Sequence, residues 1–576
     1  MTAGVQNLFI DLTEGCSELR PLAPADLILG GRALTLKLAQ DRVPPGSDPL
    51  GPANILVFAA GPLAGAGISS AGRLSVGGKS PLTGGIKEAN AGGTAGDSLA
   101  RLGLRSVVLT GSRPAGDWAV VLVDERGTRF EAARDLVGLG NYALAERVKE
   151  RYGDGYTLIS IGQAGELRYL SAGVSVTDLE FRPSRLAARG ALGAVMGSKG
   201  VKAVLVKRNG TYRQRGRDSE AFSAARKAFN DTVRGSERTA VLAKYGTAGT
   251  LMVVEKLAAL PTRNFSQGRF EHAEDISGEA LLALITARGG AGRNSHPCMA
   301  GCLIRCSNVI PDAAGAEAVA PLEYETLCLM GSNLGLGDLD AIARLNRLAN
   351  DFGVDTIEVG ATLGVMAEAG LVAFGDAEGF ARIVEELPRG SLLGRVAGNG
   401  CALAGRLLGV RRVPAVKNQA CSAYDPRGVK GTGVTYATSP MGADHTAGLT
   451  VFAKVDHHDR EGQLALSRSV QVSRAAYDAL GLCVFLQSAV GGQPGLVVDL
   501  LRSLWGIELP ADYLTVLGSE VLADEGRFNR AEGLGPETDR LPEFMETEAL
   551  PPLGLTWDIP RAELAALLDG LAQKGE

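Results

Sequence analysis

The first two hundred residues alternate short apolar runs with glycine-rich turns. The runs fall at Ile55–Phe58, Ser106–Leu109, Ala119–Val123 and Ala203–Val206. Apolar runs of this length between turn signals are typical of buried strands, because a helix usually needs a longer periodic segment. The pattern predicts a strand-rich region over residues 1–208.

From about residue 210 the apolar positions recur at helical spacing. After Asp338, a residue type that caps helices, they recur every three or four residues through Phe352. Residues 413–450 are expected to be rich in loops, and the chain after Leu482 is expected to end in a polar tail with prolines. The further predicted helices are Ser219–Val233, Leu251–Leu260, Ala377–Leu387, Leu393–Leu408 and Leu464–Leu482.

Composition narrows the class of protein. The 576 residues are 45% hydrophobic and 21% charged, which is ordinary for a globular protein, and the net charge of −5 gives no electrostatic reason to expect nucleic acid or an anionic membrane. No apolar run has the length of a membrane span, and the first residues lack the basic and apolar parts of a signal peptide. Eight scattered cysteines do not form a secreted disulfide pattern. We therefore expect a soluble cytoplasmic protein without membrane insertion.

A glycine repeat divides the first region into two similar units. Three glycines of Gly93–Val107 recur in Gly190–Val204 at a constant offset of 97 residues, and each unit ends in a basic residue and a strand. A glycine-rich turn that opens a helix presents free N–H groups, which suit phosphate. Tight packing of a helix on a sheet explains either unit alone equally well. The duplication favours two phosphate-bearing ligands held side by side.

A second repeat lies in the helical part. Residues 350–355 and 478–483 share the form [N/D]-x-x-G-[V/L]-[D/C], and each unit ends a helical run. Glycine at such a position closes a helix in the left-handed conformation, so two ordinary helix ends are one interpretation. The polar residues Asn350 and Asp478 favour another, in which they accept hydrogen bonds from a ligand.

Three of the eight cysteines lie on one segment, His296–Cys306, with the spacing C-x3-C-x3-C. Thiolates are the ligands of iron–sulfur clusters, and three on one segment leave one cluster iron for a distant ligand. The alternative is a buried stripe on one helix face, because residues four apart share a face and free cysteine packs as a small apolar residue. The preceding His-Pro favours a turn over the middle of a helix.

The cysteine segment with the isolated Cys483, the two turns and the repeated glycine units together resemble the aldehyde:ferredoxin oxidoreductase family of tungsten enzymes. The likeness runs nearly from end to end, and it depends on the order and spacing of the motifs. They are Gly61–Gly65, Ser70–Arg73, Lys79–Gly84, Gly92–Leu109, Arg189–Val204, Leu322–Thr326, Asn350–Thr356, Tyr424–Gly428, Gly442–His445 and Asp478–Cys483.

The resemblance implies an α+β fold. An N-terminal β-rich domain of two sheets related by a pseudo-twofold, residues 1–208, is followed by two mainly helical domains, residues 209–410 and 411–576. Between them the family holds a tungsten ion on the dithiolenes of two pterins, a Mg²⁺ ion that bridges the pterin phosphates, and a [4Fe–4S] cluster beside one pterin. Tungsten takes no protein ligand in this family, so none is assigned here.

The resemblance also assigns the binding residues. Cys298, Cys302, Cys306 and Cys483 match the cluster ligands, although the family usually has C-x2-C-x3-C; the extra residue here falls in the turn at Gly301. The positions that match pterin and phosphate contacts are Arg73, Asn90, Gly92, Gly93, Arg189, Gly190, Ala191, Asn350, Gly353, Asp355, Asp478, Gly481 and Leu482.

For catalysis the family places a glutamate and a histidine beside the metal, and Glu325 and His445 match them. A carboxylate in a dry pocket has a raised pKa, which suits it to accept a proton as water or an aldehyde hydrate reacts. Without the resemblance, Glu325 would be interpreted as a solvated surface residue and His445 as a structural histidine. Glu323 aligns almost as well as Glu325, and His457, among charged residues, is expected at the surface.

The implied reaction is oxidation of an aldehyde to a carboxylic acid, with electrons passing through the cluster to ferredoxin or to a small iron–sulfur subunit. One alternative keeps the fold and reduces an aromatic acyl-CoA or a carboxylic acid within a larger complex. Another is a scaffold held by zinc, but the paired C-x2-C knuckles usual for structural zinc are missing from the sequence. The resemblance implies a homodimer or a hetero-oligomer, and it does not separate tungsten from molybdenum or name the substrate.

Overall fold

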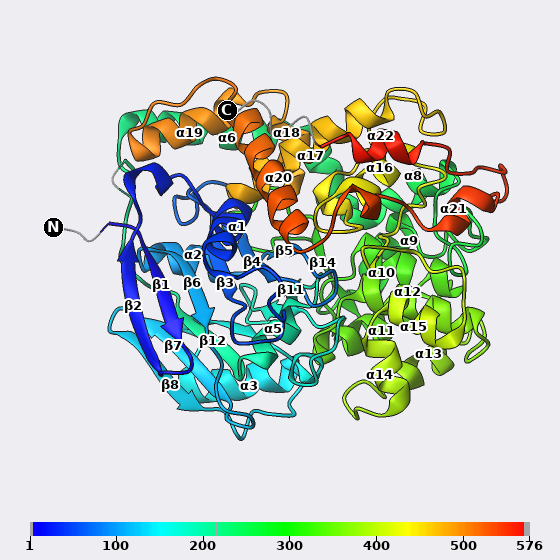
Figure 1. The fold of residues 1–576 in the computed structure, drawn as a ribbon, viewed down its shortest axis with the longest axis horizontal. Helices are drawn as coiled ribbons and strands as arrows, with labels where there is room; N and C mark the ends of the chain where they lie inside the picture. Colours follow the sequence, from blue (N-terminus) through cyan, green and yellow to red (C-terminus); the bar gives the residue numbers. More distant parts are fainter. Residues whose placement is uncertain (1–3, 215, 569–576) are drawn as a thin grey trace.

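The computed structural model describes residues 4–214 and 216–568, and its first region forms two six-stranded sheets (Figure 1). The first sheet has the strand order β2-β1-β6-β3-β4-β5 and the second has the order β11-β10-β9-β12-β7-β8. The first six strands are β1 (Gln6–Asp11), β2 (Cys16–Pro21), β3 (Leu56–Ala60), β4 (Leu74–Lys79), β5 (Ile86–Ala91) and β6 (Leu104–Thr110). The next six are β7 (Ala119–Asp124), β8 (Gly127–Ala132), β9 (Tyr156–Ser160), β10 (Val174–Val176), β11 (Arg185–Ala187) and β12 (Val201–Lys207).

The two sheets have the same topology. Read from its other edge, the second sheet runs β8-β7-β12-β9-β10-β11, which matches the first strand for strand. β6 and β12 each pair in parallel with the first strand of their half and antiparallel with the third. The helices α2 (Ala95–Arg101) and α5 (Leu192–Ser198) precede these strands at the offset of 97 residues. The glycine repeat thus corresponds to a duplicated fold, and the predicted α+β class with two sheets is confirmed.

Alternate side chains of the inner strand β7 face two different cores. In β7, Val121 and Val123 lie in the core between the two sheets, whereas Val120 and Leu122 lie in the core under α3 (Asn141–Tyr152). Successive side chains of a strand point to opposite faces, so a strand covered on both faces is apolar throughout. This burial explains why the strand runs of the sequence are continuous instead of alternating.

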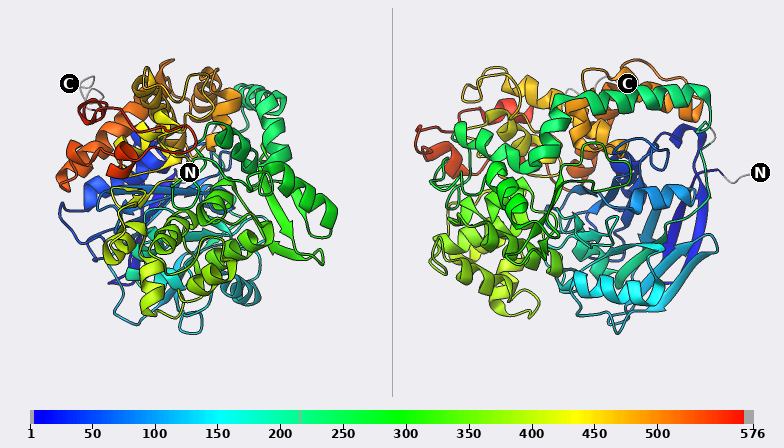
Figure 2. Two further views of the ribbon diagram at one scale, coloured as in Figure 1. Left: turned by 90° about the vertical axis from the view of Figure 1, so that its right-hand side faces the viewer. Right: turned by 180° about the vertical axis from the view of Figure 1, so that it is seen from behind.

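Helices cover the remaining faces (Figures 1 and 2). On the first sheet, α1 (Gly31–Arg42) packs against β3 and β4 and also contacts α17 (Gln463–Ala479) and α20 (Tyr513–Ala531). A second helical layer, green in Figure 1, lies beside the sheets. It contains α10 (Tyr324–Leu329), α11 (Leu339–Phe352), α12 (Thr356–Glu368), α13 (Ala377–Val384), α14 (Leu392–Gly398) and α15 (Cys401–Leu408). The other helices include α4 (Gln163–Glu166), α6 (Glu220–Gly235), α7 (Glu237–Tyr245), α8 (Leu251–Lys256), α9 (Gly278–Arg288), α16 (Lys430–Thr438), α18 (Gln487–Val490), α19 (Gly495–Trp505), α21 (Glu543–Thr547) and α22 (Arg561–Ala565).

Most helices expected between residues 219 and 408 are present. α11 begins where predicted, because the Asp338 carboxylate accepts a hydrogen bond from the Ala341 N–H at 2.7 Å. Two expected bounds are wrong. α8 ends at Lys256, four residues early, and the segment predicted as one helix to Leu408 is split into α14 and α15 at Gly400, where φ is +86°. Glycine adopts that conformation without strain, so the chain changes direction there.

Two expectations for the last third are wrong. The predicted polar tail forms α19 and α20, whose apolar side chains pack into the core beside the first sheet, whereas residues 413–450 are rich in loops as expected and also contain α16. His457, expected at the surface, is only 6% exposed. Within the described part of the chain no single helix is long and apolar enough to cross a membrane, although Val484–Val490 and Gly495–Trp505, bent by 111°, meet that test as a pair.

Candidate active site between the two sheets and the helical layers

Each sheet receives one of the two [N/D]-x-x-G turns. Gly481 has φ of +64°, and a β-carbon placed there would lie 2.8 Å from the Gly61 Cα. Gly353 has φ of +77°, and its β-carbon would lie 3.0 Å from the Gly162 nitrogen. Both contacts are backbone against backbone, so a side chain would separate the layers. Gly61 and Gly162 follow β3 and β9, the equivalent strands of the two sheets, so the two turns dock at matching places.

The four cysteines predicted as cluster ligands come together beside the first sheet. Cys302 and Cys483 lie in the core next to α1, and Cys298 and Cys306 pack against that core. The Cys483 N–H donates to the Ser70 carbonyl at 2.9 Å, which places the distant cysteine over the loop after β3. The extra residue of the cysteine segment falls in an exposed turn at Gly301, where φ is +71°.

A glycine and a serine of the first sheet face these thiols. A β-carbon on Gly92 would lie 3.1 Å from the Cys298 sulfur, so the backbone there is close to the thiol. The Ser70 hydroxyl donates to the Cys302 sulfur at 3.3 Å. A hydrogen bond from Cys298, with help from Ser70, lowers the pKa of the Cys302 thiol to about 5, while the same bond and burial raise the pKa of Cys298. The site thus stabilises thiolate at Cys302.

Arg73, Asn90 and Asp478 form a partly buried polar group next to the thiols. The Arg73 guanidinium donates through Nε to the Asn90 side-chain oxygen and through Nη2 to its carbonyl at 3.0 Å. The Asn90 amide donates to Asp478 at 3.3 Å, and Arg32 lies 3.4 Å from the same carboxylate. Burial raises the pKa of Asp478 to about 6, against the opposing charge of Arg32. The turn at residues 478–483 therefore joins the first sheet through charged groups.

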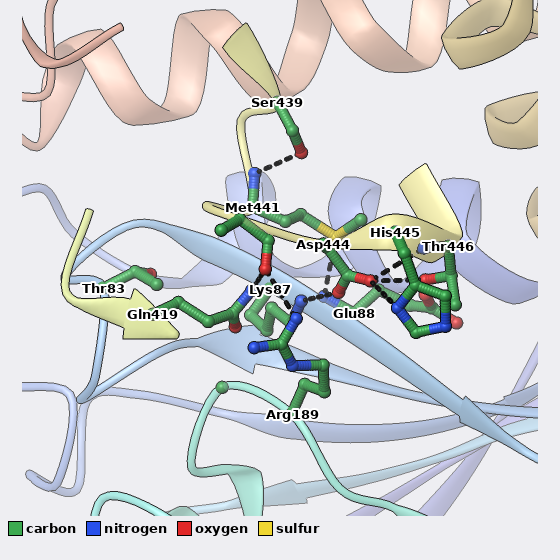
Figure 3. A network of polar contacts seen from close by, with 12 residues as sticks. Thr83, Lys87, Glu88, Arg189, Gln419, Ser439, Met441, Asp444, His445 and Thr446 are labelled. Carbon is green, nitrogen blue, oxygen red and sulfur yellow. Dashed lines mark hydrogen bonds and ion pairs between the residues drawn. The ribbon is translucent and has the colours of Figure 1, made fainter. Parts of the chain in front are cut away.

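The second glycine unit holds a different network (Figure 3). Arg189 donates to Asp355 at 3.3 Å, to the Ser422 hydroxyl at 3.1 Å and to the carbonyls of Ala443 and Ala420. The next two residues, Gly190 and Ala191, have positive φ values of 83° and 61° and lead into α5. Arg189 thus links the second sheet to three segments of the helical layers.

Lys87 and Asp444 form a buried ion pair beside this network, with 2.6 Å between Nζ and Oδ2. Burial alone would raise the pKa of Asp444, but the charges of Lys87 and Arg189 outweigh it and hold that pKa well below its usual range. A β-carbon on Gly190 would overlap the Lys87 side chain. The aliphatic stem of Lys87 therefore closes over the second glycine turn.

Asn350, the first residue of the turn at residues 350–355, is 6% exposed. Its carbonyl accepts a hydrogen bond from the Asn141 amide at 2.9 Å. Its own side-chain Nδ2 faces the Tyr142 hydroxyl, but neither of these two atoms is within full hydrogen-bond geometry of a partner among the described residues. A buried amide without a partner costs free energy on the order of 1–3 kcal/mol. Such a donor fits a site that is completed by a bound molecule.

The structure brings Glu325 and His445 together. The Glu325 Oε1 lies 3.4 Å from the His445 Nε2 and has no other hydrogen-bond partner in the described chain, while Oε2 accepts from the Ala423 N–H at 2.8 Å. Burial raises the pKa of Glu325, and His445 opposes that shift. The Tyr424 ring lies 6.1 Å from the His445 ring and 5.2 Å from the Tyr324 ring. The pair thus has an aromatic wall on one side.

Glu323 lies elsewhere. Its carboxylate accepts a hydrogen bond from the Thr247 hydroxyl, and its charge acts on Cys306, where it contributes to raising the pKa of that thiol after burial. Glu323 and Glu325 are separated by one residue at the start of α10, so their side chains point to different sides. Glu325 faces the histidine and Glu323 faces the cysteines.

Four residues at this junction were not assigned from the sequence: Lys87, Glu358, Ser422 and Asp444. Asp444 lies within one of the family motifs, Gly442–His445, so its neighbour His445 was a usable signal. Lys87 lies in β5 next to Glu88, and nothing in this local sequence indicates that the lysine is fully buried. Glu358 and Ser422 reach the site through segments whose positions only the fold defines.

The donors suit a multi-iron cluster better than a single metal ion. No group of three or more His, Cys, Asp or Glu side chains within the described residues is arranged to hold one ion. The four thiols nevertheless share one buried patch that borders Arg73 and Gly92. On the other side, the Asn350 Nδ2 has no hydrogen bond among the described residues, and the Glu325 Oε1 has only the His445 imidazole near it, at 3.4 Å. The residues fit an iron–sulfur cluster beside a larger polar ligand.

A pseudo-symmetric pair of sheets, a four-cysteine patch and a largely buried Glu–His pair point to a redox enzyme. Family models for aldehyde ferredoxin oxidoreductase match residues 7–208, as the N-terminal domain, and residues 224–568, as domains 2 and 3. The chain belongs to the aldehyde ferredoxin oxidoreductase family.

Similar proteins agree with this membership. The chain is 32% identical to the tungsten-containing aldehyde ferredoxin oxidoreductase of Pyrococcus horikoshii, over 91% of this chain and 88% of that protein. It is 24% identical to a Pyrococcus furiosus aliphatic sulfonate oxidoreductase, WOR-like subunit, over 82% and 77%. The solved active site complex BamBC of benzoyl coenzyme A reductase has a TM-score of 0.79 at 20% identity, covering 99% of this chain and 94% of that one. This last likeness concerns the fold alone.

Proposed function

We propose that this protein is a tungsten–pterin oxidoreductase that converts an aldehyde to a carboxylic acid and passes the electrons through a [4Fe–4S] cluster. The proposal depends on one observation above all, the buried Glu325 carboxylate that lies 3.4 Å from the His445 imidazole with no other partner for Oε1 in the described chain. The relatives named for tungsten and aldehydes support the substrate class.

The cluster ligands in this proposal are Cys298, Cys302, Cys306 and Cys483. The two glycine units and the two turns would hold the two pterins, with a Mg²⁺ ion between their phosphates, and Asn350 supplies a free buried donor for this purpose. Arg73 lies between Cys298, Cys483 and Asp478, so it borders both the cluster side and the pterin side. When bound, the tungsten–pterin group supplies the two-electron redox centre; molybdenum would serve the same chemistry.

Glu325 and His445 would handle the protons. A carboxylate whose pKa is raised by burial binds a proton more readily than one in water, so Glu325 is suited to accept a proton from water or from an aldehyde hydrate. Its Oε2 is held by the Ala423 N–H, which leaves Oε1 to face the reacting molecule. The His445 Nε2, 3.4 Å from the Glu325 Oε1, would donate to an oxygen of the substrate, and the aromatic wall of Tyr424 and Tyr324 would limit access of water.

The electron acceptor would be ferredoxin or a small iron–sulfur subunit. The cysteine segment reaches the surface, since Ala300, Gly301 and Arg305 are exposed while Cys298 and Cys306 are half-buried. A redox partner that contacts this segment would lie next to the cluster. The exposed Arg305 and Arg293 there would favour an acidic partner.

The test starts from protein purified without oxygen. We expect about one tungsten or molybdenum and about four irons per chain, and aldehyde-dependent reduction of a viologen dye. Glu325→Gln should keep both metals while turnover falls on the order of 10²–10⁴-fold. Because Glu325 must be ionised to accept a proton, wild-type kcat should rise as pH increases through the raised pKa of Glu325. The kcat of Glu325→Gln should not show this rise.

Glu323→Gln is the comparison variant, since Glu323 faces Cys306 instead of His445. A larger loss of turnover in this variant than in Glu325→Gln would move the base to Glu323. Zinc without iron, or reduction of an aromatic acyl-CoA with no activity on any aldehyde, would overturn the proposed function.

A further inference from the structure

Ser422 lies between the second glycine unit and the catalytic pair. It is fully buried, on the loop that follows the short strand β17 (Gln419–Ala420). Its hydroxyl oxygen is 3.1 Å from the Arg189 Nη1 and 2.9 Å from the His445 Nδ1. These are its only side-chain partners in the described residues, so the direction of both hydrogen bonds can be derived.

The direction follows from the arginine. A guanidinium has five N–H donors and no acceptor, and it stays protonated in proteins. The Ser422 oxygen must therefore accept from Arg189. Its second lone pair could accept from an Nδ1–H of His445, but the Ser422 proton would then have no acceptor among the described residues, so donation of this proton to Nδ1 is the arrangement that satisfies both groups. A ring nitrogen that accepts a hydrogen bond has no proton. The neutral imidazole therefore has its proton on Nε2, which faces the Glu325 Oε1.

Asp444 is the other acceptor near Nδ1, but both of its carboxylate oxygens already accept hydrogen bonds from other groups. The Asp444 Oδ1 lies 3.9 Å from Nδ1, but it accepts from the Thr446 N–H at 3.0 Å and from the Thr446 hydroxyl at 2.7 Å. The other oxygen, Oδ2, is paired with Lys87 at 2.6 Å. Asp444 thus provides negative charge near the ring without being placed to hold the Nδ1 proton while Ser422 is present.

Arg189 is fixed strongly enough to impose this direction. Besides Ser422 it donates to Asp355 and to the carbonyls of Ala443 and Ala420, so its donors are anchored on three sides. The Ala420 segment is itself held, because its N–H donates to the buried Glu358 carboxylate at 2.9 Å. The arrangement connects Asp355 of the turn at residues 350–355 to the imidazole through one serine.

We propose that Ser422 is a positioning residue that fixes His445 as the Nε2–H tautomer, with the N–H aimed at Glu325 and the substrate oxygen. The role given to His445 rests on the proposed function, whereas the tautomer does not. With the opposite tautomer, the Nε2 lone pair would face the Glu325 carboxylate and no donor would point to the substrate. A wrong tautomer at a similar histidine of a serine protease lowers kcat by about 10⁴-fold.

The direct test is ¹⁵N NMR of the holoenzyme labelled in its histidine rings, by magic-angle spinning with the cluster oxidised. The chain has five histidines, and His445→Gln assigns the relevant pair of signals by their disappearance. We expect the Nδ1 of His445 in the range of an unprotonated ring nitrogen and Nε2 in the protonated range. A wild-type spectrum with the proton on Nδ1 overturns the proposal, whatever the variants do.

Three variants sharpen the test. Ser422→Ala should produce a population with the proton on Nδ1, since Asp444 then has the nearest acceptor, and Ser422→Thr should restore the wild-type pattern because it keeps the hydroxyl. Ser439→Ala is the matched control: Ser439 is equally buried and caps the Met441 N–H at 3.2 Å without touching His445. An unchanged Nδ1 signal in Ser422→Ala contradicts the proposal.

Kinetics give a second readout. Ser422→Ala should lower kcat on the order of 10–10²-fold with a change in KM of less than about threefold, because the lost donor acts in the reaction and not in aldehyde capture. Ser422→Thr should recover most of kcat. A loss of kcat that Thr does not recover, with the wild-type tautomer retained in Ser422→Ala, would assign Ser422 a purely structural role. Failure of aldehyde oxidation in the wild type would overturn the proposed function and leave the spectrum to decide the tautomer.

Discussion

The two sheets of the N-terminal region each receive one turn from the helical layers, and the backbone contacts are nearly identical. The Cys483 N–H donates to the Ser70 carbonyl at 2.9 Å, and the Asp355 N–H donates to the Ser171 carbonyl at 2.8 Å. Both residues are the last of their turn and both serines follow the third strand of their half. The main chain is therefore repeated down to single hydrogen bonds.

The side chains at these equivalent places differ completely. Cys483 joins three other thiols in a patch that borders Ser70 and Gly92. Asp355 instead pairs with Arg189 and caps α12 through the Ile357 N–H at 3.0 Å. The duplicated backbone thus provides two similar docking places. The residue at the last position of each turn differs: it is a thiol, Cys483, in one half and a carboxylate, Asp355, in the other. We infer that one half serves electron transfer and the other orders the catalytic pair.

Single substitutions at the two equivalent positions, Cys483 and Asp355, should have the largest effect and test this division most directly. Cys483→Ser should remove the visible absorbance of the cluster and most of the iron, because a hydroxyl is a poor replacement for a thiolate ligand. Asp355→Asn, which keeps the shape, should leave iron near the wild-type level. Iron analysis and absorbance of anaerobic protein measure both. A full iron content in Cys483→Ser would remove this residue from the ligand set.

The first residues of the two turns offer a second contrast. The Asn350 Nδ2 has no partner in the described chain, whereas Asp478 is tied to Asn90 and Arg32. Asn350→Leu should lower the bound pterin several-fold, since it removes the free donor at similar volume. Asn346→Leu is the control, because that amide is already bonded to the Pro321 carbonyl at 2.6 Å.

Pterin content is measured by fluorescence after oxidative release from the protein. The Asn346→Leu variant loses a buried hydrogen bond and should be less stable, yet it should keep its pterin. Equal pterin content in Asn350→Leu and the wild type would mean that the turn at residues 350–355 is an ordinary helix end and does not bind pterin through Asn350. A matching fall in both variants would attribute the effect to stability.

Much of this arrangement could be predicted from the sequence. Glycines leave a local signature, so the offset of 97 residues between Gly93 and Gly190 indicated the duplicated unit, and the helix caps at Asp338 and Gly353 were found at single positions. The association of Glu325 with His445 came from family resemblance, since 120 residues of chain separate them.

The rest could not be predicted, for physical reasons. Strand β5 could not be predicted as a buried strand, because it contains Lys87 and Glu88, and these two residues are buried only when the layers assemble. α20 was missed because its charged residues include the buried Glu525, which is paired with Arg32, and because its apolar side chains are buried only when α17 packs against them. The role of Ser422 depends on three segments meeting at one oxygen, which no local pattern encodes.

The glycine contacts of the two halves predict equal losses of stability. A β-carbon on Gly61 would overlap the Leu480 carbonyl, and one on Gly162 would overlap the Phe352 carbonyl. Each Gly→Ala change should destabilise the fold by about 1–3 kcal/mol, the usual cost of overpacking a tight contact. Gly235→Ala is the control, since no atom lies within 4 Å of its β-carbon and alanine favours the end of α6. Thermal unfolding measures all three, and a loss in only one half would show that the two contacts are not energetically equivalent.

The last prediction concerns the pH dependence of stability and the carboxylate of Glu358, which holds segments next to the second sheet. This carboxylate is fully buried and accepts from the Cys401 N–H at 3.1 Å and the Ala420 N–H at 2.9 Å. Burial raises its pKa from 4.5 to about 7, with Arg189 opposing the shift. Between these two values the folded chain keeps a proton that the unfolded chain has released.

Stability contributed by this proton is therefore complete below about pH 4.5, declines as pH rises through about 7, and is level above it. Glu358→Gln cannot lose a proton, so its unfolding midpoint minus that of the wild type should increase between pH 5 and pH 8. The lost acceptor in glutamine adds a constant offset, which does not affect this slope. The opposing effects of Arg189 and of the two backbone donors are already included in the pKa of about 7. A difference that stays flat over the same range would mean that Glu358 is ionised throughout and that Arg189 and the two N–H groups fully offset its burial.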